Sequence, residues 1–125
     1  LLAQLGLRPS TDPKLGIAPH ELADTVLRTI SIPEIATLRP RLLPEHTVFG
    51  SKIDGANETL VSGIADAVAR NTEGKIDVVI DWKSDIEMNA AKLAAYRRQL
   101  GEYRLQTGAE RALLVMMTTG TILNV

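Results

Sequence analysis

The stretch Lys75-Ile-Asp-Val-Val-Ile-Asp-Trp-Lys-Ser-Asp85 decides the fold, because an apolar strand pattern ends there at a carboxylate, an aromatic ring and a lysine. Side chains alternate along a strand. We therefore expect one face to hold Ile76, Val78, Ile80 and Trp82, and the other to hold Asp77, Val79, Asp81 and Lys83. Asp81 and Lys83 should point the same way, roughly 6 to 7 Å apart along the strand.

Two more strands are predicted immediately before this one. Residues 45–53 carry an apolar pattern that stops at Asp54-Gly55, a pair favoured in tight reversals. Residues 60–69 form the next strand pattern, which contains Asp66. A second hairpin signal at residues 71–74 then leads into the third strand. These three strands should form an antiparallel sheet.

Helical patterns flank the strands on both sides. Residues 20–30 read as an amphipathic helix, and Ser31 with Glu34 has the spacing of a capping box that would start a short second helix ending at Pro40. Helix formers dominate residues 87–107, where an apolar stripe ends at Gly108 and contains Leu93, Tyr96, Leu100 and Tyr103.

The C-terminal part completes the predicted fold. Residues 111–118 read as a buried strand, and a strand–helix–strand crossover would place it parallel to the third strand. Residues 121–125 would add an edge strand. The result is an α/β domain with a mixed central sheet of about four to five strands flanked by helices, in the order α-β-β-β-α-β.

Length and composition set limits on the rest. The 125 residues suit one domain, with residues 1–18 as a linker or loop, and the missing initial methionine suggests a fragment of a larger protein. A net charge of -1 offers no overall electrostatic case for nucleic acid, so any positive surface must be local. The sequence contains no cysteine, which excludes disulfides and thiolate metal sites. The longest apolar run, residues 112–117, is too short to span a bilayer. Together with the missing cysteine, this leads us to expect a cytoplasmic protein.

The strand ends carry groups suited to one kind of chemistry. Asp66 and Asp81, on adjacent antiparallel strands, could hold a divalent metal, because magnesium prefers oxygen ligands. Lys83 could orient or deprotonate an attacking water and balance developing negative charge. Taken alone, Asp81 and Lys83 would more often be a turn cap and a solvated charge. Gln99 borders the apolar stripe and needs partners, for which a neighbouring carboxylate or a phosphate would serve.

Three motifs together resemble the PD-(D/E)XK nuclease superfamily, in particular the C-terminal nuclease domain of RecB and AddA, which are UvrD-type helicase–nucleases. The motifs are Gly63-Ile-Ala-Asp66, Ile80-Asp-Trp-Lys-Ser-Asp85 and Tyr96-Arg-Arg-Gln-Leu-Gly-Glu-Tyr103. They occur in the family's order, within residues 45–118. The resemblance implies a restriction-endonuclease-like core.

The resemblance also implies roles for individual residues. Asp66 and Asp81 would bind Mg2+ or Mn2+ with the backbone carbonyl of Trp82, and Lys83 would be the catalytic lysine. Gln99, Tyr103 and Tyr96 would support the site or contact the DNA. The implied activity is that of a deoxyribonuclease, expected to be an exonuclease, in double-strand-break repair. Its partners would be DNA, a helicase domain in the parent chain and a helicase–nuclease subunit.

Two further residues match the family less directly. The family often carries a histidine ligand in a Gly-x-x-x-His setting, and Gly16 with His20 has that spacing. However, residues 23–45 align more naturally with the helix just before the first strand, which would put the histidine helix upstream. Glu45 corresponds to a glutamate often seen at the first strand. If the histidine is missing, the alternative is a catalytically incomplete, nuclease-like scaffold that binds DNA.

Overall fold

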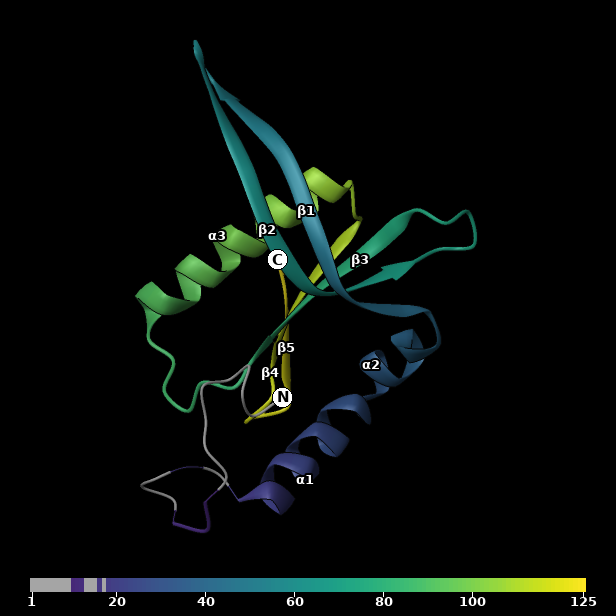
Figure 1. Cartoon of the computed structure of the whole chain (residues 1–125), viewed down its shortest axis with the longest axis vertical. Helices are drawn as coiled ribbons and strands as arrows, with labels where there is room; N and C mark the ends of the chain where they lie inside the picture. Colours follow the sequence, from purple (N-terminus) through teal and green to yellow (C-terminus); the bar gives the residue numbers. More distant parts are fainter. Residues whose placement is uncertain (1–9, 13–15, 17) are drawn as a thin grey trace.

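The computed structural model describes residues 10–12, 16 and 18–125, so the predicted loop at 1–18 falls mostly outside the described residues. A five-stranded sheet lies between helices (Figure 1). In chain order the elements are α1 (Pro19–Ile30), α2 (Pro33–Leu38), the 3-10 turn η1 (Arg39–Arg41), β1 (Leu42–Asp54), β2 (Asn57–Arg70), β3 (Ile76–Lys83), α3 (Ala90–Thr107), β4 (Arg111–Met116) and β5 (Thr121–Asn124).

The sheet is mixed, and its strand order is the same as the order along the chain. β1, β2 and β3 are antiparallel neighbours, and β4 pairs with β5 in the same way. β3 and β4 are parallel, and α3 makes the crossover between them. A parallel pair needs such a crossover because its strands start from the same edge. The predicted α/β fold with a mixed central sheet is confirmed, and its element order is consistent with a restriction-endonuclease-like core.

Each face of the sheet buries its own core. On one face, Leu100 and Tyr103 of α3 pack with Val68, Val79 and other buried residues. On the other face, Ile35 and Leu38 of α2 pack with a set that includes Ala67, Val78, Ile80 and Leu113. Val79 and its neighbours Val78 and Ile80 thus face opposite ways, as the alternation in β3 predicted.

The predicted capping box at Ser31 is wrong. The Ser31 hydroxyl donates to the Leu27 carbonyl at 2.7 Å, so it closes α1 and does not start α2. α2 begins at Pro33, whose fixed φ suits the first helical position. The third helix begins three residues later than predicted, because Asn89 is its N-cap and accepts from the Lys92 N–H at 2.8 Å. Gly108, in the left-handed conformation at φ 70°, ends it as predicted.

β1 and β2 extend beyond the predicted strands and form a long hairpin that projects from the body of the molecule (Figure 1). Residues 51–60, which form the outer end of the hairpin, are all exposed. The inner end lies in the sheet, where Val68 is fully buried. The hairpin therefore joins a packed base to a solvated tip.

Candidate functional site

β2 and β3 separate at the residues predicted to carry chemistry. Their ladder ends at the pair Ala67–Ile80, and in place of the next pair the Trp82 N–H donates to Oδ2 of Asp66 at 2.8 Å. β3 continues to pair with β4 as far as Lys83. We call this divergence of β2 from β3 the fork. The Asp66 carboxylate thus accepts from a backbone N–H that would otherwise bond to a carbonyl of the neighbouring strand.

Asp81 and Lys83 form an ion pair inside the fork. Nζ of Lys83 lies 2.6 Å from Oδ2 of Asp81, and both side chains are largely buried. The predicted common direction of these two side chains is confirmed. Because charges buried without a partner are costly, the pair holds each group in a defined position.

Asp66 also influences Asp81 electrostatically. Burial raises the pKa of Asp81 above its ordinary value, the Lys83 ammonium lowers it, and the nearby Asp66 carboxyl raises it again. Two carboxyls that repel one another gain from a cation placed between them. The fork therefore brings together the three residues that the sequence singled out.

A pocket of about 670 Å³ opens beside the fork. Asp66, Trp82 and Lys83 line one part of it, and α1 supplies the opposite wall through Val26, Thr29 and Ile30. Glu45 also lines this pocket. Its φ of 52° is unusual for a residue that has a Cβ atom, and the neighbouring ladder pairs are Pro44–Ala67 and His46–Ala65. Strained backbone of this kind is concentrated at functional sites.

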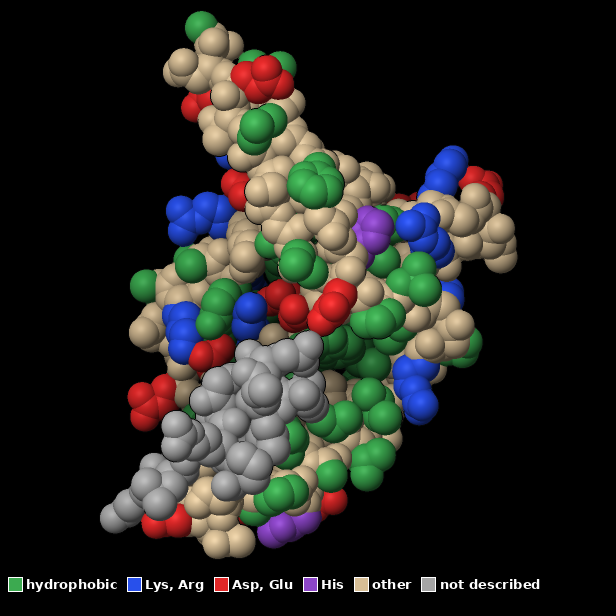
Figure 2. Space-filling view, in the orientation of Figure 1, with side chains coloured by type: hydrophobic (Ala, Val, Ile, Leu, Met, Phe, Trp, Pro, Cys, Tyr) green, Lys and Arg blue, Asp and Glu red, His purple; other side chains and the backbone are tan. Residues whose placement is uncertain are grey.

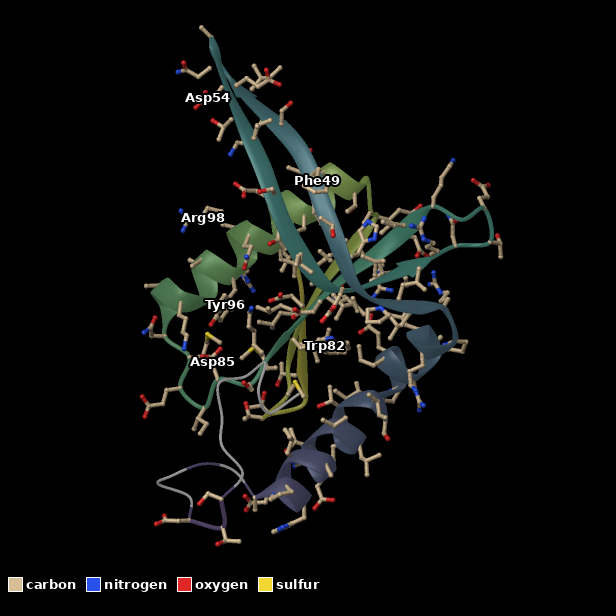
Figure 3. All side chains as sticks on the ribbon, viewed as in Figure 1. Phe49, Asp54, Trp82, Asp85, Tyr96 and Arg98 are labelled. Carbon is tan, nitrogen blue, oxygen red and sulfur yellow. The ribbon has the colours of Figure 1, made fainter. Side chains whose placement is uncertain are left out.

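Tyr96 is a second contact of Lys83, besides the Asp81 carboxylate. The Lys83 ammonium is 4.3 Å from the centroid of the Tyr96 ring, which is cation–π distance. The Tyr96 hydroxyl donates to Oδ2 of Asp85 at 3.0 Å, and Lys92 forms an ion pair with the other oxygen of Asp85. Figure 3 shows Asp85 and Tyr96 together near the start of α3, with Arg98 on its outer side.

The pKa values in this cluster follow from its contacts. The Lys92 ammonium lowers the pKa of Asp85, and Tyr96 and Lys83 add to that effect. The Asp85 carboxylate in turn raises the pKa of Lys92. Burial, followed by the Asp85 carboxylate, raises the pKa of Tyr96. Asp85, Lys92 and Tyr96 consequently remain in their ordinary charge states near neutral pH.

Gln99 and Tyr103 take positions outside the fork. Gln99 donates to the Tyr103 hydroxyl at 3.2 Å, so this hydroxyl takes the place of the carboxylate that the sequence suggested as a protein partner. Tyr103 is buried and its hydroxyl lies against Gly63, where an added Cβ would stand 2.1 Å from the oxygen. Gly63 is therefore required for the close approach of α3 to β2. Tyr103 therefore packs α3 against β2 at Gly63.

His20 is exposed on the first turn of α1 and does not line the pocket beside the fork. Among the residues that the structure describes, no group of three His, Asp or Glu side chains is arranged to hold a metal ion. Asp66 and Asp81 still suit magnesium or manganese, because magnesium commonly takes one or two protein carboxylates and completes its shell with water and phosphate. Asp66 and Asp81 thus match the number and type of protein ligands that such an ion commonly takes.

Sequence reasoning named Tyr96 but missed its neighbour Lys92, the contact between Gly63 and Tyr103, and the α1 wall of the pocket. Lys92 and Tyr96 are separated by one helical turn and so share a face of α3, a spacing that could have linked them to one carboxylate. The contact between Gly63 and Tyr103, and the α1 wall of the pocket, depend on tertiary packing that leaves no local signal.

Comparisons with known proteins inform the fold only. No family model and no curated protein matches this chain. Among solved structures, the crystal structure of SSO0001 is similar, with a TM-score of 0.53 and 24% sequence identity. The match covers 86% of this chain and 51% of that one, so the chain spans about half the length of SSO0001. Within the described residues, the structure has no helix that is long and apolar enough to cross a membrane.

Proposed function

We propose that this chain is a metal-dependent DNA nuclease module of the RecB/AddA-like kind, which hydrolyses phosphodiester bonds. The observation that carries the proposal is the fork, where Asp66 and Asp81 adjoin and Lys83 lies 2.6 Å from Asp81. Its wider context, a helicase–nuclease in double-strand-break repair, follows from the motif resemblance.

Each residue of the fork has a place in the proposed reaction. Asp66, Asp81 and the Trp82 carbonyl would hold Mg2+ or Mn2+. When bound, such an ion lowers the pKa of water and neutralises charge on the phosphate oxygens. The Lys83 ammonium would orient the attacking water and stabilise negative charge that develops at phosphorus. The pocket beside the fork would admit the DNA strand.

Cleavage of labelled oligodeoxynucleotides tests this proposal. Single- and double-stranded substrates are incubated with the 125-residue chain and Mg2+ or Mn2+, with EDTA as the metal-free control. We expect metal-dependent cleavage that falls about 100-fold or more in Asp81→Ala and in Lys83→Ala, the range for losing a positioned acid–base group.

Matched controls come from the same chain. Asp54→Ala and Lys75→Ala remove an exposed aspartate and an exposed lysine at hairpin turns outside the fork, and should cleave like the wild type. Undiminished cleavage by both fork variants would overturn the catalytic assignment.

A second candidate function is that of a DNA-contacting scaffold without a complete site. The observation in its favour is that no third His, Asp or Glu completes a metal-binding group within the described residues. Gel-shift binding of the same oligodeoxynucleotides without metal-dependent cleavage would favour this candidate.

A further inference from the structure

Lys83 has a second contact besides Asp81, on the side where α3 begins. Its ammonium lies 2.6 Å from the Asp81 carboxylate and 4.3 Å from the centroid of the Tyr96 ring. A lysine side chain has four rotatable bonds and is not held in place by a single ion pair. The aromatic face attracts a cation and blocks the conformations that point toward α3. Lys83 is thus confined from two directions.

Three kinds of contact hold the Tyr96 ring. Its Cα belongs to α3, and its side chain packs against the buried core, as Leu93 and Met88 do. The hydroxyl donates to Oδ2 of Asp85 at 3.0 Å. A hydrogen bond to a charged acceptor is stronger than one between neutral groups. The ring therefore has little freedom to rotate away from Lys83.

Asp85 is held in turn by two contacts of its own. Lys92 neutralises one carboxylate oxygen, and the Asp85 carbonyl accepts from the Thr118 hydroxyl at 2.9 Å. This second bond ties the loop after β3 to the segment after β4. Without Lys92, the Asp85 carboxylate would be a second anion available to the Lys83 ammonium.

We propose that Tyr96, anchored by Asp85 and Lys92, is a positioning residue that sets the location of the Lys83 ammonium in the fork. The expected effect of Tyr96 on cleavage rests on the proposed function. The placement of Lys83 can be measured whether or not the chain cleaves DNA. Asp85 and Lys92 act through Tyr96 and do not touch the reacting atoms.

Nuclear magnetic resonance of the chain, labelled with 13C-lysine, tests the placement directly. The Lys83 Hε signals are assigned with Lys83→Arg and should lie upfield of those of the other lysines because of the Tyr96 ring. We expect Tyr96→Leu to remove this shift. Tyr96→Phe and Asp85→Asn keep the ring but remove or weaken its bond to Asp85, so both should reduce the shift. Arg98→Gln, on the outer side of α3, is the matched control and should change nothing (Figure 3).

Cleavage kinetics give the second measurement on the same variants. Tyr96→Leu should lower kcat about tenfold, with KM within about twofold, and Tyr96→Phe should stay within about threefold of the wild type. If Tyr96→Leu leaves the Lys83 signals in place, or Asp85→Asn leaves them unmoved, the positioning role is wrong. If the shifts behave as expected but the wild type does not cleave DNA, the proposed function fails and the placement of Lys83 stands.

Discussion

The two ends of the β1–β2 hairpin have the same secondary structure and opposite surroundings. At the inner end, Val68 is completely buried between the sheet and α3, and Asp66 sits in the fork. At the outer end, Leu60 of the same strand is 82% exposed, and Phe49 and Ile53 are exposed on the partner strand. Figure 2 shows hydrophobic side chains scattered singly along this arm. Backbone pairing builds the arm, with polar contacts from α3 to Ser51 and Lys52, whereas burial of apolar side chains surrounds the site.

The largest expected difference between the two ends is in stability. Val68→Ala removes two buried methyl groups and should lower the free energy of unfolding by about 2 kcal/mol, through lost transfer energy and the cavity left behind. Leu60→Ala should change it by no more than about 0.5 kcal/mol, as is usual for exposed positions. Urea denaturation followed by circular dichroism measures both. Equal losses would mean that the tip is packed in solution.

Gly63 and Gly50 extend the comparison of stability between the inner end and the outer part of the hairpin, with smaller expected losses. Gly63→Ala forces a Cβ atom to within 2.1 Å of the Tyr103 hydroxyl, and we expect it to cost roughly 1 to 3 kcal/mol because that ring is buried. Gly50→Ala, nearer the tip, meets Oε1, Cδ and Cγ of the flexible Gln106 side chain. That side chain can move by giving up its bond to the Ser51 carbonyl, so this variant should cost less. A thermal melt of each variant separates the two cases. A smaller loss for Gly63→Ala than for Gly50→Ala would contradict the packing role of Tyr103.

Two aspartates should respond to pH in opposite directions. The pKa of Asp85 in the folded chain lies below its ordinary value of 3.8, so ionised Asp85 stabilises the fold above that pH, and the gain is lost as pH falls through the lowered pKa. The pKa of Asp81 is raised, so its ionisation costs stability, and the cost grows as pH rises from 3.8 through the raised pKa.

The corresponding variants make this difference measurable. At neutral pH, Asp85→Asn should be less stable and Asp81→Asn more stable than the wild type, and both differences should shrink toward zero as pH falls below these pKa values. Urea unfolding in a pH series provides the measurement. The effect of Asp85→Asn should be small, because Lys92, which pairs with Asp85, is solvent-accessible and water screens the pair. Destabilisation by Asp81→Asn at neutral pH would show that the ion pair with Lys83 outweighs the burial of its carboxylate.

Much of this fold could be predicted from the sequence because its signals are local. The alternation in β3, the reversal at Asp54-Gly55 and the stop at Gly108 each depend on residues adjacent in the chain. The parallel placement of β4 followed from crossover geometry. The capping box at Ser31 failed because its hydroxyl had a competing acceptor one turn earlier in α1.

The site could be predicted only in part. Strand alternation predicted that the Asp81 and Lys83 side chains point the same way. The bond from Trp82 to Asp66 depends on where two strands separate, and the contact between Gly63 and Tyr103 depends on how closely a helix approaches a strand. Sequence spacing does not determine either of these tertiary distances.

Binding of Mn2+ tests the central claim, that the fork brings Asp66 and Asp81 together as ligands, most directly. Isothermal titration of the 125-residue chain should show one binding site, whose affinity falls tenfold or more, about 1.4 kcal/mol, in Asp66→Asn and in Asp81→Asn. Asp54→Asn, at the exposed hairpin tip, should bind like the wild type. If all three variants bind Mn2+ with the affinity of the wild type, the fork does not hold the metal and the account is contradicted.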